Sequence, residues 1–294
     1  MRWRRLNRMI GFRFLTAGVA VMGSAGLPVY AETPAATEDH GTTEVTVTFQ
    51  SESLSTSSQY MAILPDPLEP GRRYPVLYLL HGAEGSHRTY TMRTSVTQEM
   101  QKHTFIVVMP DGGKDGWYLD SDLVSHHSYE SFIIKDLIAD VDRRFPTVAS
   151  RFGRGIAGFS MGGHGAFSLA AKHPELFIAA SSISGTLRLE NHTAWKVFHK
   201  LMGPYPEAAN EWQSHSAFAL ADRFTTSGIK LLFDTGTSDT MTLSDNQDFH
   251  DRLMEVDVPH TFLLLPGDHS WPYWRLRLPE HLKFHQRAFL RAVP

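Results

Sequence analysis

The run GIAGFSMGG, residues 155–163, decides the fold of this chain. Small and apolar residues lead into Ser160, and a segment with helical spacing follows over residues 161–173. A serine at a tight strand-to-helix turn needs small neighbours, which Gly158 and Gly162 supply two positions to either side. The pattern G-x-S-x-G also occurs by chance, but the flanking strand and helix predict a nucleophile elbow with Ser160 at its tip.

Apolar segments like the one before Ser160 recur along the chain and alternate with helical patterns. The predicted strands are residues 43–49, 59–64, 74–80, 105–109, 155–159, 177–183, 229–233 and 261–265, and the predicted helices are 95–103, 133–145, 161–173, 246–256 and 279 to the C-terminus. This alternation predicts one α/β domain over residues 43–294, with a mostly parallel sheet flanked by helices. The aromatic-rich segment 187–226 interrupts the alternation and predicts a small cap insertion.

The first residues differ from this domain in composition. Five arginines precede residue 14, an apolar run covers residues 14–22, and the small-x-small triplet Val29-Tyr30-Ala31 follows. This pattern predicts a signal peptide over residues 1–31, then a linker over 32–42, and an exported protein that is periplasmic or secreted. An uncleaved membrane anchor is the alternative, although the apolar run is shorter than the roughly 20 residues that span a bilayer. No stable membrane association is expected after cleavage.

Composition excludes other classes of function. The formal net charge is −3, so the chain has no excess of positive charge with which to bind nucleic acid. The chain has no cysteine, which excludes a lipid-anchored lipoprotein. His126 and His127 suggest a metal site, but adjacent histidines point in different directions and no second ligand cluster accompanies them.

A serine nucleophile needs a general base, and His269 fits this role. It follows the last apolar strand in the run PGDHSW, residues 266–271, at the edge where parallel sheets place their ligands. An acid must then orient the imidazole. Asp239, on the loop after the strand 229–233, is favoured over Asp234, which still belongs to that strand by its alternation, and over Asp268, which is adjacent to the base.

Hydrolysis by a serine nucleophile also needs hydrogen-bond donors for the tetrahedral oxyanion. The backbone N–H of Met161, directly after the nucleophile, is one predicted donor. The loop after the strand 74–80 supplies the second, because Gly82 lets the chain bend and turns the N–H of Ala83 toward the site.

Several of these segments together resemble the putative-esterase (esterase D-like) family of α/β-hydrolases. They are YLLHG (78–82), GWY (116–118), AGFSMGG (157–163), GTSD (236–239) and GDHSW (267–271). The resemblance covers about residues 43–289 and implies an α/β-hydrolase fold, a catalytic trio at Ser160, Asp239 and His269, an oxyanion hole at Ala83 and Met161, and ester hydrolysis without metal or cofactor.

The substrate is predicted only as a class. A small-molecule or polysaccharide ester with a short-chain, sugar-acyl or aromatic acyl group fits an exported member of this family best. S-formylglutathione hydrolases resemble the core, but they are cytosolic and usually carry a cysteine-containing loop at the position of residues 81–83. An acyl transferase of the mycolyl type and a non-enzymatic binding protein are further alternatives. Trp117, Tyr118, Trp271 and Trp274 are candidates for an aromatic substrate pocket or, equally, for core packing.

Overall fold

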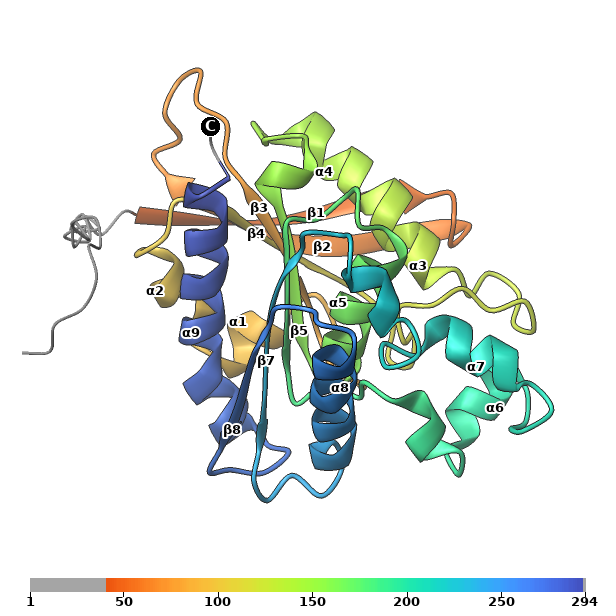
Figure 1. Cartoon of the computed structure of the whole chain (residues 1–294). Helices are drawn as coiled ribbons and strands as arrows, with labels where there is room; N and C mark the ends of the chain where they lie inside the picture. Colours follow the sequence, from red (N-terminus) through yellow and green to blue (C-terminus); the bar gives the residue numbers. More distant parts are fainter. Residues whose placement is uncertain (1–40, 293–294) are drawn as a thin grey trace, which may run out of the picture. The chain divides into compact units, whose positions relative to one another are not determined.

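The computed structural model describes residues 41–292, and this part of the chain is built on an eight-stranded sheet (Figure 1). The strands are β1 (Gly41–Ser51), β2 (Thr56–Asp66), β3 (Val76–Leu80), β4 (Ile106–Pro110), β5 (Arg154–Phe159), β6 (Ala179–Ile183), β7 (Lys230–Gly236) and β8 (Thr261–Leu265). Their order in the sheet is β1-β2-β4-β3-β5-β6-β7-β8. β1, β2 and β4 pair antiparallel, and all pairs from β4 to β8 are parallel. The predicted mostly parallel sheet is therefore confirmed.

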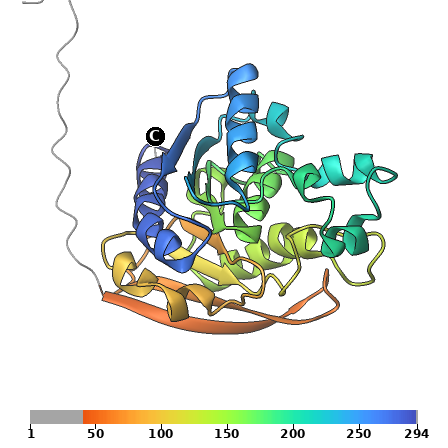
Figure 2. The same cartoon turned by 90° about the horizontal axis from the view of Figure 1, so that it is seen from below.

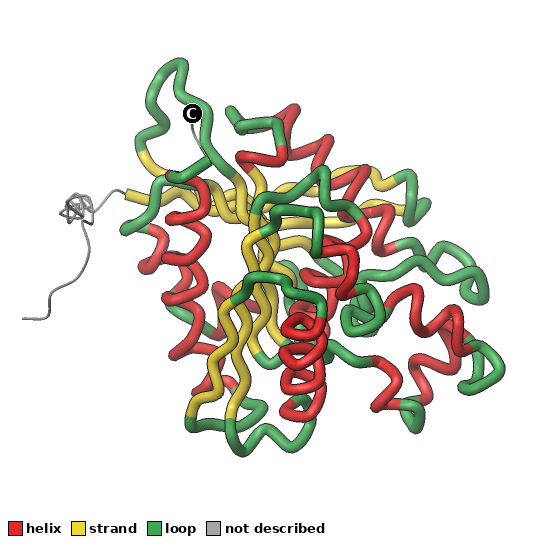
Figure 3. The backbone as a smooth tube through the Cα atoms, in the orientation of Figure 1, coloured by secondary structure: helices red, strands yellow, loops and turns green. Residues whose placement is uncertain are grey.

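Helices cover both faces of the sheet (Figures 1 and 3). The helical elements are α1 (Thr89–Arg93), α2 (Val96–Met100), α3 (Tyr129–Ser131), the π-helical η1 (Phe132–Leu137), α4 (Ile138–Arg144), η2 (Arg151–Gly153), α5 (Met161–Lys172), η3 (Leu189–His192), α6 (Lys196–Met202), α7 (Ala209–His215), η4 (Ala221–Phe224), α8 (Leu243–Glu255) and α9 (Trp271–Leu290). α1, α2 and α9 lie on one face, and α4, α5 and α8 lie on the other. This is the α/β-hydrolase layering predicted above.

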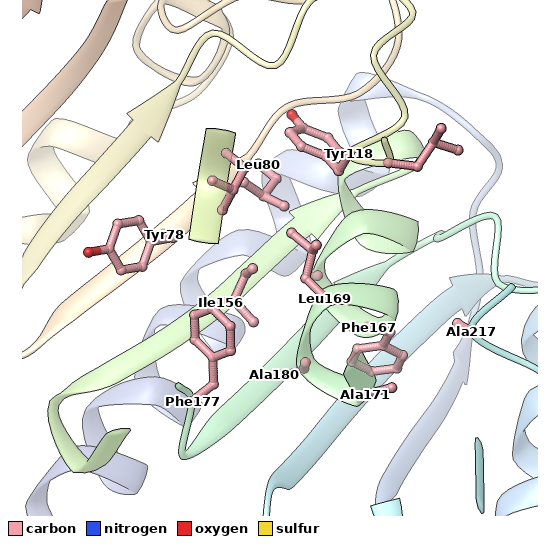
Figure 4. Packing of buried hydrophobic residues seen from close by; sticks show 14 of the residues in the cluster. Tyr78, Leu80, Tyr118, Ile156, Phe167, Leu169, Ala171, Phe177, Ala180 and Ala217 are labelled. Carbon is pink, nitrogen blue, oxygen red and sulfur yellow. The ribbon is translucent and has the colours of Figure 1, made fainter. Parts of the chain in front are cut away.

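Alternation along the strands divides the apolar residues between two cores. In β3, Tyr78 and Leu80 pack in the core beneath α5, whereas Leu77 and Leu79 pack beneath α9. Figure 4 shows the first of these cores, which includes Tyr78, Leu80 and Ile156 of the sheet and Phe167 and Leu169 of α5. Because both faces are covered, β3 and β4 are buried at every position, and the other inner strands are mostly buried, with polar residues such as Ser181 and Asp234 among them. This explains why the sequence predicts them well.

Several boundaries differ from the predicted ones. β1 begins at Gly41, so the last two residues of the predicted linker 32–42 belong to a strand that pairs with β2. α9 begins at Trp271, eight residues before the predicted start at Pro279. Proline is tolerated in the first turn of a helix, where Pro272 lies, and Pro279 lies inside α9. The helix therefore starts one residue before the first of its two prolines, and the predicted start at the second was wrong.

Short helices connect β6 to β7 in the segment predicted as a cap, residues 187–226. Its aromatic residues pack on one another and continue the core beneath α5: Phe198 of α6 lies 5.4 Å from Trp212 of α7, ring centroid to centroid, and stacks on Trp195 at 5.6 Å. Figure 2, which views the molecule from below Figure 1, shows this segment at one side of the sheet. The predicted signal peptide falls on residues outside the described part of the chain. Within residues 41–292, no helix has the length and apolar character needed to cross a membrane.

Candidate active site

Ser160 lies at the turn between β5 and α5, as predicted. Its φ of 54° and ψ of −121° place a non-glycine residue in a region of backbone space that is strained. The turn holds because the Ser160 N–H donates to the Ile183 carbonyl oxygen at 3.0 Å. A Cβ added to Gly162 would lie 2.1 Å from the Leu80 carbonyl oxygen, so only glycine fits at this position. The glycine pattern thus arises from the close approach of two backbones.

His269 connects Ser160 to Asp239. It lies on the loop between β8 and α9, and its Nε2 is 2.9 Å from Ser160 Oγ. Its Nδ1 is 2.9 Å from Asp239 Oδ2. Since a carboxylate can only accept, Nδ1 carries the proton in this bond, and Nε2 is left to accept the hydrogen bond of the serine hydroxyl. The structure therefore brings together the three residues predicted to act as nucleophile, base and acid.

Asp239 is fully buried, but each of its oxygens has partners. Oδ1 accepts from the N–H groups of Met241 and Thr242 at 3.1 and 3.0 Å, and Oδ2 accepts from Thr242 Oγ1 at 2.8 Å in addition to His269. Burial by itself raises the pKa of Asp239, but the bonds from His269 and Thr242 outweigh it and lower the pKa to about 2. The carboxylate is ionised at neutral pH and is held in place from its own loop.

Asp234, the alternative acid, has a different role. Its buried carboxylate accepts from Tyr273 Oη at 3.0 Å, Arg277 Nε at 2.8 Å and His281 Nε2 at 2.9 Å. Burial raises the pKa of Asp234, but His281 and Arg277 hold it below its usual value. Asp234 therefore fixes the first turns of α9 to β7. Asp268 is exposed and accepts a hydrogen bond from Ser270.

Hydrogen bonds to neighbouring segments hold the loop that carries Ala83 in place. His81 donates from Nδ1 to the Gly82 carbonyl oxygen at 2.7 Å, and its Nε2 accepts from the Gly112 N–H at 2.9 Å. Tyr118 Oη donates to the His81 carbonyl oxygen at 3.0 Å. Ala83 lies on the wall of the same cleft as Ser160. Met161 is the first residue of α5, where N–H groups have no intrahelical partner. Both predicted oxyanion donors therefore belong to rigid segments beside Ser160.

A cleft of about 530 Å³ opens above Ser160. Its walls include Ala83, Phe159 and His269, the aromatic residues Trp271 and Trp274, and the side chains of Met92, Arg93 and Met241. The Trp274 ring stands edge-on to the His269 ring, with centroids 5.0 Å apart, and so supports the imidazole from the side. Met92, Arg93 and Met241 belong to no motif, and sequence reasoning missed them for that reason.

The predicted substrate-binding aromatics divide into two groups. Trp271 lines the cleft, but Trp117 and Tyr118 do not. Trp117 is 3% exposed and packs against Phe198 of the cap at 4.5 Å between ring centroids. Tyr118 is 1% exposed and supports the loop at His81. For these two residues the core-packing interpretation is correct. Both residues therefore support the cap and the loop at His81 and do not contact the cleft.

No metal site accompanies the cleft in the part of the chain that the structure describes. His126 is exposed, and His127 Nε2 donates to the Gly116 carbonyl oxygen at 3.0 Å. The two adjacent histidines thus have different environments.

Comparison with known proteins identifies the family of this chain. A family model described as "Putative esterase" matches residues 51–285. Esterase Rv1288 of Mycobacterium tuberculosis is 32% identical over 248 residues, which are 75% of this chain and 54% of that protein. The chain thus spans about half the length of this relative. S-formylglutathione hydrolase of Bos taurus is 27% identical over 260 residues, 80% of this chain and 90% of the relative.

Among solved structures, the fluorophosphonate-binding serine hydrolase FphF of Staphylococcus aureus superposes with a TM-score of 0.73 at 25% identity. The match covers 83% of this chain and 98% of that one. The extent of the family match and the likeness of fold lead to one conclusion: this chain belongs to the esterase family of α/β-hydrolases.

Proposed function

We propose that this chain is an exported serine carboxylesterase that hydrolyses short-chain, sugar-acyl or aromatic-acid esters through an acyl-enzyme. The observation that carries the proposal is the unbroken hydrogen-bond relay from Ser160 Oγ through His269 to the ionised Asp239. Family membership and the likeness to a serine hydrolase support it.

The relay suits acyl transfer. As Ser160 Oγ attacks the ester carbonyl carbon, its proton passes to His269 Nε2, and the imidazolium is stabilised by Asp239. The N–H groups of Ala83 and Met161 stabilise the oxyanion. His269 then protonates the departing alkoxide, which leaves Ser160 acylated. Water, deprotonated by the same imidazole, attacks the acyl-enzyme and restores the free serine.

A thioester is the second candidate substrate. The similarity to S-formylglutathione hydrolase over 80% of this chain favours it, because the same relay can expel a thiolate. The loop at residues 81–83 differs from the one predicted for that branch, since it contains His81 and no cysteine. The aromatic cleft at Trp271 and Trp274 fits an acyl group of modest size in either case.

Turnover of p-nitrophenyl acetate and butyrate tests the proposal. We expect release of nitrophenol that is unchanged by a metal chelator and abolished by a fluorophosphonate, with the added mass on Ser160. Activity that is lost with the chelator, or label on another residue, would contradict the mechanism.

Export is proposed from the charged start, the apolar run and the triplet ending at Ala31. Expression of the full chain in a bacterial host, followed by N-terminal sequencing of the protein outside the cytoplasm, is expected to give a first residue at Glu32. Retention of the intact chain in the cytoplasm would refute this part of the proposal.

A further inference from the structure

A second hollow lies beside the catalytic cleft, and its rim is positively charged. Its volume is about 500 Å³. Lys196 and Lys200 reach it from α6, and Lys114 reaches it from the segment after β4. His127 and Tyr129 contribute to its lining. We call this site the lysine hollow.

The charges that line the lysine hollow are unbalanced. Three ammonium groups face one carboxylate, that of Asp115. Within residues 41–292, neither Lys196 nor Lys200 has an ion-pair partner, and Lys114 has only a long one, with Glu84 at 3.9 Å. Lys196 and Lys200 stand four residues apart on one helix, where like charges repel. An anion bound between them would relieve this repulsion.

The remaining lining groups do not cancel this charge. His127 donates from Nε2 to the Gly116 carbonyl oxygen, and burial lowers its pKa, so the ring is neutral. Burial raises the pKa of Tyr129, which keeps its hydroxyl as a hydrogen-bond donor. Tyr129 therefore adds no negative charge to the lining of the lysine hollow. The lining therefore keeps a net positive charge, which attracts an anionic group such as a carboxylate.

The lysine hollow and the catalytic cleft share a wall. Ala83 and Glu84 line the cleft, and the Glu84 N–H donates to the Lys114 carbonyl oxygen at 2.8 Å. On its other side the segment after β4 is tied to the cap, because Ser121 Oγ donates to the Leu201 carbonyl oxygen at 2.6 Å. Figure 2 shows this segment beside the cap helices. A substrate longer than the cleft would have to cross the wall at Glu84 to reach the lysines.

We propose that the lysine hollow binds a carboxylate on the leaving alcohol or thiol of the substrate, so that the enzyme selects anionic esters or thioesters. This inference rests on the proposed esterase function, because it names the leaving group of that same reaction. An acidic sugar and a carboxylate-bearing thiol peptide share the required chemistry.

Isothermal titration of the mature chain with four leaving-group probes tests the proposal. Digalacturonate is paired with neutral galactobiose, and glutathione with its neutral diamide, so that the two pairs distinguish an acidic sugar from a thiol peptide. The variants are Lys200→Glu, the milder Lys200→Gln, and Lys135→Glu. Lys135 is an exposed lysine of η1 without an ion pair among the described residues, and it lines neither hollow, so it controls for general charge.

We expect at least one anionic probe to bind the wild type more tightly than its neutral partner. Its Kd should rise about tenfold or more in Lys200→Glu, less in Lys200→Gln, and not in Lys135→Glu, as expected for loss of a charge-assisted contact. Equal binding of anionic and neutral probes, or an equal loss in Lys135→Glu, would overturn the inference. Hydrolysis of p-nitrophenyl acetate shows that each variant is folded. A wild type that binds the anion but hydrolyses no ester would refute the proposed function and leave the site standing.

Discussion

Ser160→Ala is expected to lower kcat for p-nitrophenyl acetate by ~10⁴–10⁶-fold, because the variant has no oxygen to form the acyl-enzyme. The residual rate would come from the oxyanion donors and from substrate binding alone. The side chain of Ser160 takes part in one hydrogen bond, to His269, so its removal should leave the melting temperature within a few degrees of the wild type.

Ser238→Ala is the matched control, since Ser238 is an exposed serine on the loop that carries Asp239. Its kcat should equal that of the wild type. Initial rates at saturating ester give kcat for each variant, and thermal melting followed by circular dichroism gives its melting temperature. Wild-type turnover in a folded Ser160→Ala protein would remove the nucleophile from the proposed mechanism.

Local patterns predicted the parts of the molecule that depend on local interactions. The strand 155–159, the turn at Ser160 and the helix that follows are neighbours in sequence, and glycine spacing there reflects a backbone contact that any member of the fold must make. His269 was found in the same way, because it follows a strand and a glycine. The alternation of strands and helices was therefore enough to predict the fold class, and the resemblance of five segments to a known family was enough to predict the family.

Long-range contacts account for most of what the sequence could not settle. Asp234 and Asp239 both lie near the end of β7, and local alternation only favours one of them. What separates their roles is Arg277 and His281, more than 40 positions away, which pair with Asp234. Trp117 was ambiguous for the same reason, since its partner Phe198 belongs to the cap.

Asp239→Asn is expected to lose kcat and keep its stability, whereas Asp234→Asn is expected to lose stability and keep its kcat. In Asp239→Asn, the amide nitrogen cannot accept from His269 Nδ1–H and the neutral side chain cannot stabilise the imidazolium, so kcat should fall by ~10⁴-fold. An amide oxygen still accepts from the N–H groups of Met241 and Thr242, and the amide nitrogen can donate to Thr242 Oγ1, so the fold should persist.

Asp234→Asn instead leaves Arg277 and His281 buried beside a neutral side chain. Breaking a buried ion pair on one side costs about 3–5 kcal/mol, so the free energy of unfolding and the melting temperature should drop markedly. At a temperature where this variant is still folded, it should keep most of its kcat, because Asp239 and His269 are intact. Urea unfolding and steady-state kinetics on both variants test the pair together. If a folded Asp234→Asn lost kcat by orders of magnitude while Asp239→Asn kept it, the relay described here would have the wrong acid.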